Sequence, residues 1–176
     1  MGLYIPMFYV QSFAIEEGIT SENLAFYMLS IINAASVFGR LVPNFIADTV
    51  GPLNVLIPCT IVAALLAFCW LAVKNTVGLI VFCLLYGFFT GGLVSLPPTV
   101  LVSLSPSMAV VGSRMGTCFA FNGISLLVGT PIAGALVKPG DFKGAIAFCG
   151  SVVIFGCIFL ILARIVKVGT ALHAKI

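Results

Sequence analysis

The stretch from Val77 to Leu104, VGLIVFCLLYGFFTGGLVSLPPTVLVSL, contains no charged residue. A helix needs about 20 predominantly apolar residues to cross a hydrocarbon core about 30 Å thick, so this stretch is long enough to span a membrane. The rest of the chain has the same character, because 61% of the 176 residues are hydrophobic and only 7% are charged. An ordinary soluble domain is about 45–50% apolar and about 25% charged. The composition therefore predicts an integral membrane protein.

Apolar runs of similar length recur along the chain and predict an all-α, polytopic membrane helix bundle with about five full crossings. The predicted spans of this single transmembrane domain, residues 1–176, cover 24–47, 53–73, 77–104, 115–137 and 145–166, and a cytoplasmic tail follows over 167–176. A partial helix over residues 1–15 precedes them, and it rises only about 21 Å. This segment lacks the basic start and the cleavage site of a signal peptide. We interpret it as the second half of a helix whose first half is missing.

Most charged residues fall in short connections that alternate between the two sides of the membrane. The basic residues on one side are Arg40, Arg114, Arg164, Lys167 and Lys175, and those on the other are Lys74, Lys138 and Lys143. Cytoplasmic segments carry an excess of Lys and Arg, so the first side is expected to be cytoplasmic. The loops 16–23 and 138–143 are then extracellular, and the loops 48–52 and 105–114 are cytoplasmic. A plasma membrane protein with a cytoplasmic C-terminus is the expected arrangement.

Several classes of function are excluded by what the sequence lacks. The net charge of +3 comes from scattered basic residues, so no patch is typical of nucleic-acid binding. The six cysteines lie singly in apolar runs without metal-ligand spacing, and we expect neither a disulfide nor a metal site. The only histidine, His173, lies in the polar tail, and Asp48 and Asp141 fall in loops on opposite sides. We therefore expect no enzyme and no cofactor.

Small residues and prolines inside the spans indicate closely packed and bent helices. Gly87 with Gly91, and Gly112 with Gly116, are pairs of small residues at the spacing that lets helix backbones approach each other. The prolines within spans or at their ends are Pro43, Pro58, Pro97, Pro98 and Pro131. The backbone groups that they free are tolerated in a membrane only where protein or a watery cavity covers them. Bent helices of this kind are typical of transporters.

Polar side chains within the spans are the candidate functional residues, because they are costly in lipid and tend to face a cavity or a partner. Asn33, Ser36 and Arg40 lie at i, i+3 and i+7 and so share one helix face, which Asn44 extends. Such a stripe indicates a helix that lines an aqueous path, and interhelical hydrogen bonding without a substrate is the alternative reading. The other candidates for substrate contact are Tyr9, Gln11 and Asn122.

The segment Met28–Asp48, MLSIINAASVFGRLVPNFIAD, resembles the eighth helix of the monocarboxylate transporter family within the major facilitator superfamily. Gly2–Phe13 is similar to the end of that family's seventh helix, and Phe82–Gly92 to its tenth. Gly129–Gly134 resembles the Gly-Pro-rich stretch of the eleventh helix. The order and spacing agree along the chain, in the style of the fungal branch, which also contains proteins likened to riboflavin transporters.

The resemblance implies the C-terminal six-helix half of a major facilitator fold, with its first helix truncated. It implies a secondary active transporter that moves a small organic anion by alternating access between two halves. In the family an arginine on the eighth helix holds the substrate carboxylate, and Arg40 falls on that position. The family's proton-coupling aspartate lies one turn earlier, where this chain has Ser36. The substrate therefore stays open among a monocarboxylate, another organic anion and riboflavin.

The expected partners are that small organic anion, the lipid bilayer, and a missing N-terminal half or a full-length relative. Two other readings remain at this point. A channel-like pore would assemble symmetrically around repeated polar stripes. An inactive or regulatory membrane fragment would bind a full-length transporter without restoring transport of its own.

Overall fold

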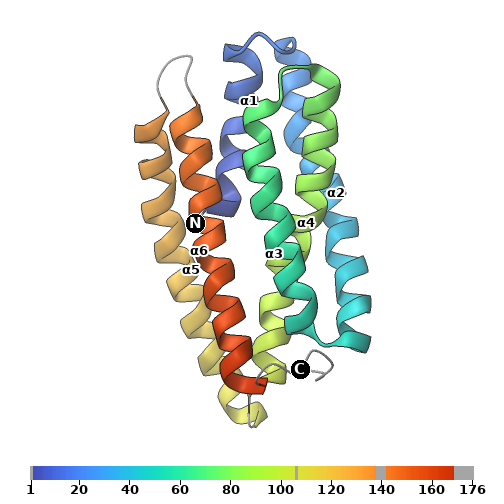
Figure 1. Cartoon of the computed structure of the whole chain (residues 1–176), viewed down its shortest axis with the longest axis vertical. Coiled ribbons are helices and arrows are strands. Elements are labelled where there is room, and N and C mark those ends of the chain that lie inside the picture. Colours follow the sequence, from blue (N-terminus) through green and yellow to red (C-terminus); the bar gives the residue numbers. More distant parts are fainter. Residues whose placement is uncertain (1, 106, 138–141, 169–176) are drawn as a thin grey trace.

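The computed structural model describes residues 2–105, 107–137 and 142–168, and every regular element in these ranges is helical. In chain order the elements are η1 (Gly2–Tyr4), α1 (Ile5–Glu16), α2 (Glu22–Val50), α3 (Pro52–Cys69), η2 (Trp70–Ala72), α4 (Thr76–Ser103), α5 (Met108–Leu136) and α6 (Lys143–Val168). They stand side by side in an elongated bundle (Figure 1). Five helical segments, α2, α3 with η2, α4, α5 and α6, are long and apolar enough to cross a membrane. The predicted all-α membrane helix bundle is confirmed, with five candidate membrane spans.

Short connections hold consecutive helices next to each other. α2 ends at Gly51, whose φ of 101° is unfavourable for residues with a Cβ. Pro52 follows as the first residue of α3, where its missing N–H has no partner to lose. A second glycine with positive φ, Gly18 at 62°, turns the chain between α1 and α2. These two turns reverse the chain at opposite ends of the bundle (Figure 1).

The start of α5 differs from the sequence prediction. A loop was predicted up to Arg114, but the helix already begins at Met108. Arg114 is exposed and its Nη1 donates to the carbonyl oxygen of Leu104, at 3.2 Å, just beyond the end of α4. Polar residues can continue a helix where it leaves the lipid, since they stay hydrated there. Apolar runs therefore locate a span better than they locate the end of its helix.

α2 and α4 form the closest helix pair, and glycines allow their approach. A Cβ placed on Gly91 would collide with the carbonyl oxygen of Ser36, and one placed on Gly39 would collide with that of Phe88. Gly87 likewise lies against the backbone of Ile32. The predicted close packing at Gly87 and Gly91 is thus present.

The second glycine pair behaves differently. No described atom outside the local helix backbone lies within 4 Å of a Cβ built on Gly112 or on Gly116. The prediction that these two glycines bring helices together is therefore wrong within the described bundle. In their helix, α5, only 11% of the most apolar 18-residue stretch is buried in the bundle. In the other four spans the buried share of this stretch is 33–50%.

The upper half of the bundle, as drawn in Figure 1, has a core of aromatic rings contributed by α1, η2, α4 and Phe142, the residue that precedes α6. Trp70 stacks on Phe82 with ring centroids 5.6 Å apart, and Phe82 stacks on Tyr86 at 5.3 Å. Phe13 of α1 meets Trp70 and Phe142 edge to face, at 5.3 and 5.4 Å. A separate apolar cluster around Leu53, Leu56, Ala63, Leu93 and Leu96 joins α3 to α4.

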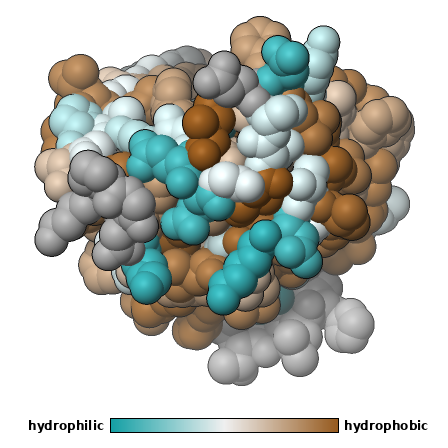
Figure 2. All heavy atoms as spheres, turned by 90° about the horizontal axis from the view of Figure 1, so that it is seen from above, coloured by the Kyte–Doolittle hydropathy of each residue, from teal (hydrophilic) through white to brown (hydrophobic). Residues whose placement is uncertain are grey.

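The surface of the bundle has polar ends and apolar sides. Seen from above, hydrophilic residues gather across the upper end, and hydrophobic residues surround them (Figure 2). Glu16, Glu17, Lys74 and Lys143 lie at this end, where α1 stops and where α4 and α6 begin. Large exposed hydrophobic side chains occur along α2, α5 and α6, as expected for surfaces that meet lipid or another membrane protein.

Candidate substrate path

The structure divides the polar stripe predicted on α2. Ser36 is buried, with 3% of its surface exposed, and its backbone packs against Gly91 of α4. Its hydroxyl donates to the carbonyl oxygen of Asn33 at 2.7 Å. Asn33 itself is exposed, and its Nδ2 donates to the carbonyl oxygen of Leu29 at 3.0 Å. Ser36 therefore belongs to the α2–α4 contact, and Asn33 with Arg40 to the exposed side of α2.

Asn44, which extends the stripe, connects the two helices. Its Nδ2 donates to the carbonyl oxygen of Arg40 at 2.6 Å and to the hydroxyl of Ser95 on α4 at 3.0 Å. Both acceptors lie within hydrogen-bond distance, so the amide group of Asn44 serves the contact between α2 and α4. Of the two readings of the stripe, interhelical hydrogen bonding describes Asn44.

Arg40 lies at mid-height of the bundle on an exposed surface. The preceding residue, Gly39, touches Phe88, which is near the middle of the 28 residues of α4. Its neighbours Phe38 and Leu41 are 65% and 54% exposed. The described part of the chain offers the guanidinium group neither a hydrogen bond nor an ion pair. A charge at this depth is costly in lipid, so this surface requires water, a ligand or another polypeptide beside it.

The remaining predicted site residues lie on the α1 and α5 side. Tyr9 is half-buried, and its hydroxyl is 3.4 Å from the carbonyl oxygen of Thr130 on α5, to which it donates. Gln11 is exposed on α1, and Asn122 is exposed on α5. Asn122 lines two adjoining hollows whose walls do not include Arg40. The predicted residues thus form two groups, one on α2 and one on α1 with α5.

The larger of these hollows has a volume of about 630 Å³ and is largely apolar. Its walls come from α3, α4, α5 and α6, and Gly2 and Leu3 of the N-terminal turn also line it. The smaller hollow, about 210 Å³, lies between α4 and α5 and shares Leu3, Pro97 and Asn122 with the larger one. Sequence reasoning missed both, because their walls are apolar residues far apart in the chain.

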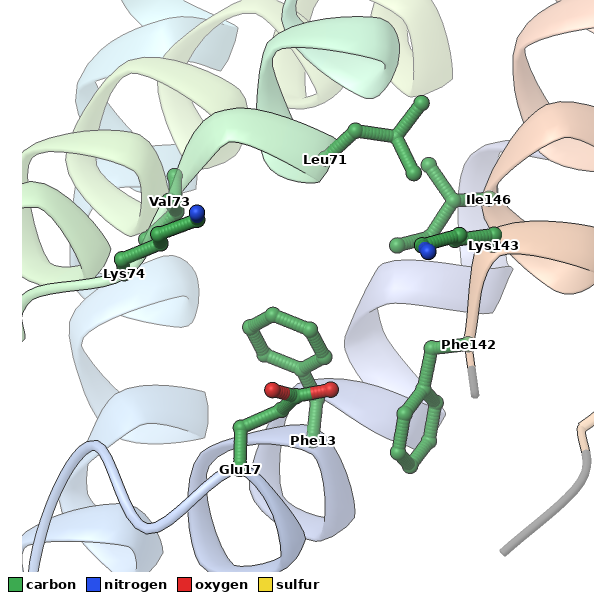
Figure 3. A pocket seen from close by; sticks show the side chains of 8 residues that line it. All are labelled: Phe13, Glu17, Leu71, Val73, Lys74, Phe142, Lys143 and Ile146. Carbon is green, nitrogen blue, oxygen red and sulfur yellow. The ribbon is translucent and has the colours of Figure 1, made fainter. Parts of the chain in front are cut away.

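A third hollow, of about 320 Å³, opens at the upper end of the bundle (Figure 3). The side chains of Glu17, Lys74 and Lys143 surround it, and Phe13 and Phe142 form part of its wall. The charged residues come from the end of α1, the connection after η2 and the start of α6. The sequence placed all three on one side of the membrane, although it gave no indication that they line a common space.

α2 and α5 are the least apolar of the five spans. Their mean hydropathy is 1.5 each, whereas the other three have values of 2.2 to 2.7. Together they carry the candidate residues Asn33, Arg40 and Asn122 on exposed positions. A polytopic helix bundle with polar groups at mid-height on selected helices is typical of membrane transport proteins, the class defined by this fold and site.

Comparison with known proteins gives the family. Residues 1–173 match the family model described as Major Facilitator Superfamily. The chain belongs to this superfamily of membrane transporters. No solved structure matches the chain significantly.

The similar proteins include several fungal transporters. The MFS-type transporter dbaD of Emericella nidulans is 43% identical over 138 residues, which are 78% of this chain and 31% of that protein. The Agnestins efflux protein AgnL12 of Paecilomyces divaricatus is 41% identical over 99% of this chain and 40% of its own length. The Aspyridones efflux protein apdF of Emericella nidulans is 36% identical over 95% and 34%. The chain thus spans less than half the length of these curated relatives.

Proposed function

We propose that this chain forms the C-terminal half of a secondary active transporter that exports a small organic anion by alternating access. The observation that carries the proposal is Arg40, an exposed cation at mid-height of a membrane bundle without a partner among the described residues. The resemblance of Met28–Asp48 to the eighth helix of monocarboxylate transporters supports a carboxylate as its ligand. A planar guanidinium group suits bidentate contact with a carboxylate.

The opposing half would pack against the exposed sides of α2 and α5, which lie on opposite sides of the bundle (Figure 1). This arrangement is supported by the lower hydropathy of these two spans and by the small buried share of α5. A partner beside α2 would separate Arg40 from lipid and leave a path between the two halves. Asn33 would line the same path, whereas Ser36 would act through the α2–α4 contact. Tyr9 and Gln11 would reach the same path from α1, and Asn122 would reach it from α5.

The direction and the coupling ion are further parts of the proposal. Two relatives carry the word efflux in their names, which supports outward transport. Ser36 occupies the position of the proton-coupling aspartate in monocarboxylate transporters, and its buried hydroxyl is bonded to Asn33. Proton coupling at this position of α2 is therefore not part of the proposal. The substrate classes retained are a monocarboxylate, another organic anion and riboflavin.

Transport by the chain alone and by a joined protein tests this function. The joined protein carries the part of AgnL12 that precedes the matched region, followed by residues 1–176, and both proteins are reconstituted in liposomes. We expect the joined protein to move at least one member of a panel of labelled carboxylates and riboflavin, and the chain alone to remain at background. Equal transport by both proteins would contradict the need for an opposing half. If the joined protein stays inactive and the chain inhibits a full-length relative, the regulatory-fragment reading is favoured.

Membrane orientation provides a second test. In a cysteine-free version, Glu17→Cys and Lys74→Cys should react with an impermeant maleimide added to intact cells. Thr49→Cys, at the other end of α2, should react only after permeabilisation. All three positions are exposed, so reactivity reports the side of the membrane. The opposite labelling pattern would reverse the proposed orientation, which places the upper end of Figure 1 outside the cell. The predicted loop residues 138–141 and tail residues 169–176 lie outside the described ranges.

A further inference from the structure

We propose that the smaller hollow, between α4 and α5, binds an aromatic ring that carries a hydrogen-bond donor such as a hydroxyl group. The inference rests on the proposed function, since the ring would belong to the transported molecule, and it names a substrate class. It is carried by backbone and side-chain polar groups that lack partners and line one hollow deep in the bundle. A simple aliphatic monocarboxylate has no ring of this kind.

Two adjacent prolines give α4 two free hydrogen-bond acceptors. Proline has no N–H group, so Pro97 and Pro98 leave the carbonyl oxygens of the residues four positions earlier, Leu93 and Val94, without their helical donors. All four residues line the hollow. Carbonyl groups of a helix point toward its C-terminal end, and thus from Leu93 and Val94 toward the two prolines. No side chain of the described residues donates to either oxygen.

The opposite wall carries polar side chains that are also without partners. Asn122 is the central residue of α5, and its side chain is exposed. Neither its amide group nor the hydroxyl of Tyr4 has a hydrogen bond within the described part of the chain, and both residues line the hollow. Polar groups at this depth are costly in lipid, so they indicate contact with a ligand or with water. The amide of Asn122 can both donate to a ligand and accept from it.

The composition of the walls defines the ligand. Carbonyl oxygens only accept hydrogen bonds, so a ligand that pairs with Leu93 and Val94 must donate. Tyr4 and Phe119 bring aromatic rings to the lining, and aromatic rings pack favourably against each other. A few polar groups among apolar walls are typical of small-molecule sites, and the volume of about 210 Å³ accommodates one part of such a molecule. Arg40 does not line this hollow, so recognition of the ring is separate from recognition of the anionic group.

The native cysteines allow a binding test in the unmodified chain. Cys118 lines the hollow, and Cys69 is exposed outside it. The purified chain in detergent is alkylated with N-ethylmaleimide in the presence of uncharged 2-naphthol, and both cysteines are followed by mass spectrometry of their peptides. We expect 2-naphthol to slow alkylation of Cys118 at least threefold at saturation and to leave the rate at Cys69 unchanged.

A matched ligand without the donor tests the hydrogen bond. 2-Methoxynaphthalene keeps the rings and the oxygen atom of 2-naphthol but has no O–H group. A hydrogen bond of ordinary net strength corresponds to about two- to tenfold in affinity, so we expect 2-naphthol to half-protect Cys118 at a free aqueous concentration lower by this factor. Equal half-protecting concentrations for the two ligands would overturn the proposal. Protection of Cys118 by sodium or potassium chloride but not by 2-naphthol would also overturn it, because the ligand would then be a cation.

Restoring the missing amides locates the acceptors. Pro97→Val combined with Pro98→Val keeps apolar bulk and returns the N–H donors to the carbonyl groups of Leu93 and Val94. We expect this variant to bind 2-naphthol no better than 2-methoxynaphthalene, whose own half-protecting concentration should stay within about twofold of the parent. Pro58→Val, the same exchange at an exposed position of α3 outside the lining, should retain the preference for 2-naphthol. A preference that survives the double exchange would overturn the proposal.

The outcome is distinguishable from that of the proposed function, because none of these readouts measures transport. Donor-dependent protection of Cys118 in a chain whose joined protein moves no substrate would leave this site standing and contradict the transporter. An active joined transporter whose Cys118 is not protected by 2-naphthol would contradict this site alone.

Discussion

Replacing Arg40 with alanine in the joined transporter is expected to lower the initial rate of organic-anion transport by at least about tenfold. The guanidinium group is exposed at mid-height and has no partner among the described residues, so a bound anion would be its partner. A hydrogen bond to a charged group contributes about 1.5–3 kcal/mol, which corresponds to about 10- to 150-fold. Initial rates normalised to the amount of reconstituted protein provide the measurement.

Arg40→Lys separates charge from geometry at the same position. Lysine keeps the positive charge but loses the planar fork that contacts both carboxylate oxygens, so we expect a substantial loss with this variant as well. Arg114→Ala removes a cation near the start of α5, where the side chain contacts Leu104, and should leave the rate within about twofold. Normal kinetics for Arg40→Ala at normal protein levels would exclude Arg40 from substrate binding.

The depth of Arg40 also bears on the alternative in which its side chain simply extends to the lower membrane surface. Side chains on a helix lean toward its N-terminus. The N-terminus of α2 lies at the upper end of the bundle, so Arg40 leans away from the lower surface (Figure 1). The contact of Gly39 with Phe88 places the residue near the middle of α4. Both observations favour a partner within the membrane over simple extension to water.

The helices were predictable because membrane spans are local features of a sequence. An uncharged run such as Val77–Leu104 specifies a crossing without reference to the rest of the chain, and α4 occupies nearly the same residues. The start of α5 was less predictable, because Ser113 and Arg114 continue the helix beyond its apolar part. Hydropathy identifies contact with lipid, whereas the helix itself ends where its backbone hydrogen bonding ends.

The candidate site was only partly predictable, because it depends on the contacts between helices. The spacing of Asn33, Ser36 and Arg40 fixes their positions around the axis of α2. It does not say which of these positions faces α4. The structure turns Ser36 toward Gly91 and leaves Arg40 exposed. The apolar hollow was not visible at all, since residues such as Leu56 and Leu160 have no distinguishing pattern in the sequence.

The α2–α4 contact itself leads to the second large expected effect. Gly39→Val should destabilise the bundle strongly, because the new Cβ would collide with the carbonyl oxygen of Phe88. The obstacle is helix backbone, which cannot move aside as the end of a flexible side chain can. Overpacking costs typically about 1–3 kcal/mol, and more when backbone must shift. We therefore expect at least the upper end of this range.

The only tryptophan, Trp70, supplies the measurement, because it is fully buried and stacked on Phe82. Its fluorescence during heating in detergent should give an unfolding midpoint about 6–12 °C lower for Gly39→Val, if about 3 kcal/mol is lost. Gly112→Val is the matched control, because open space surrounds that glycine in the described bundle and its substitution adds the same side chain. Its midpoint should stay within about 2 °C of the parent. Equal midpoints for Gly39→Val and Gly112→Val would show that α2 and α4 do not pack through their glycines, and the depth assigned to Arg40 would then lose its support.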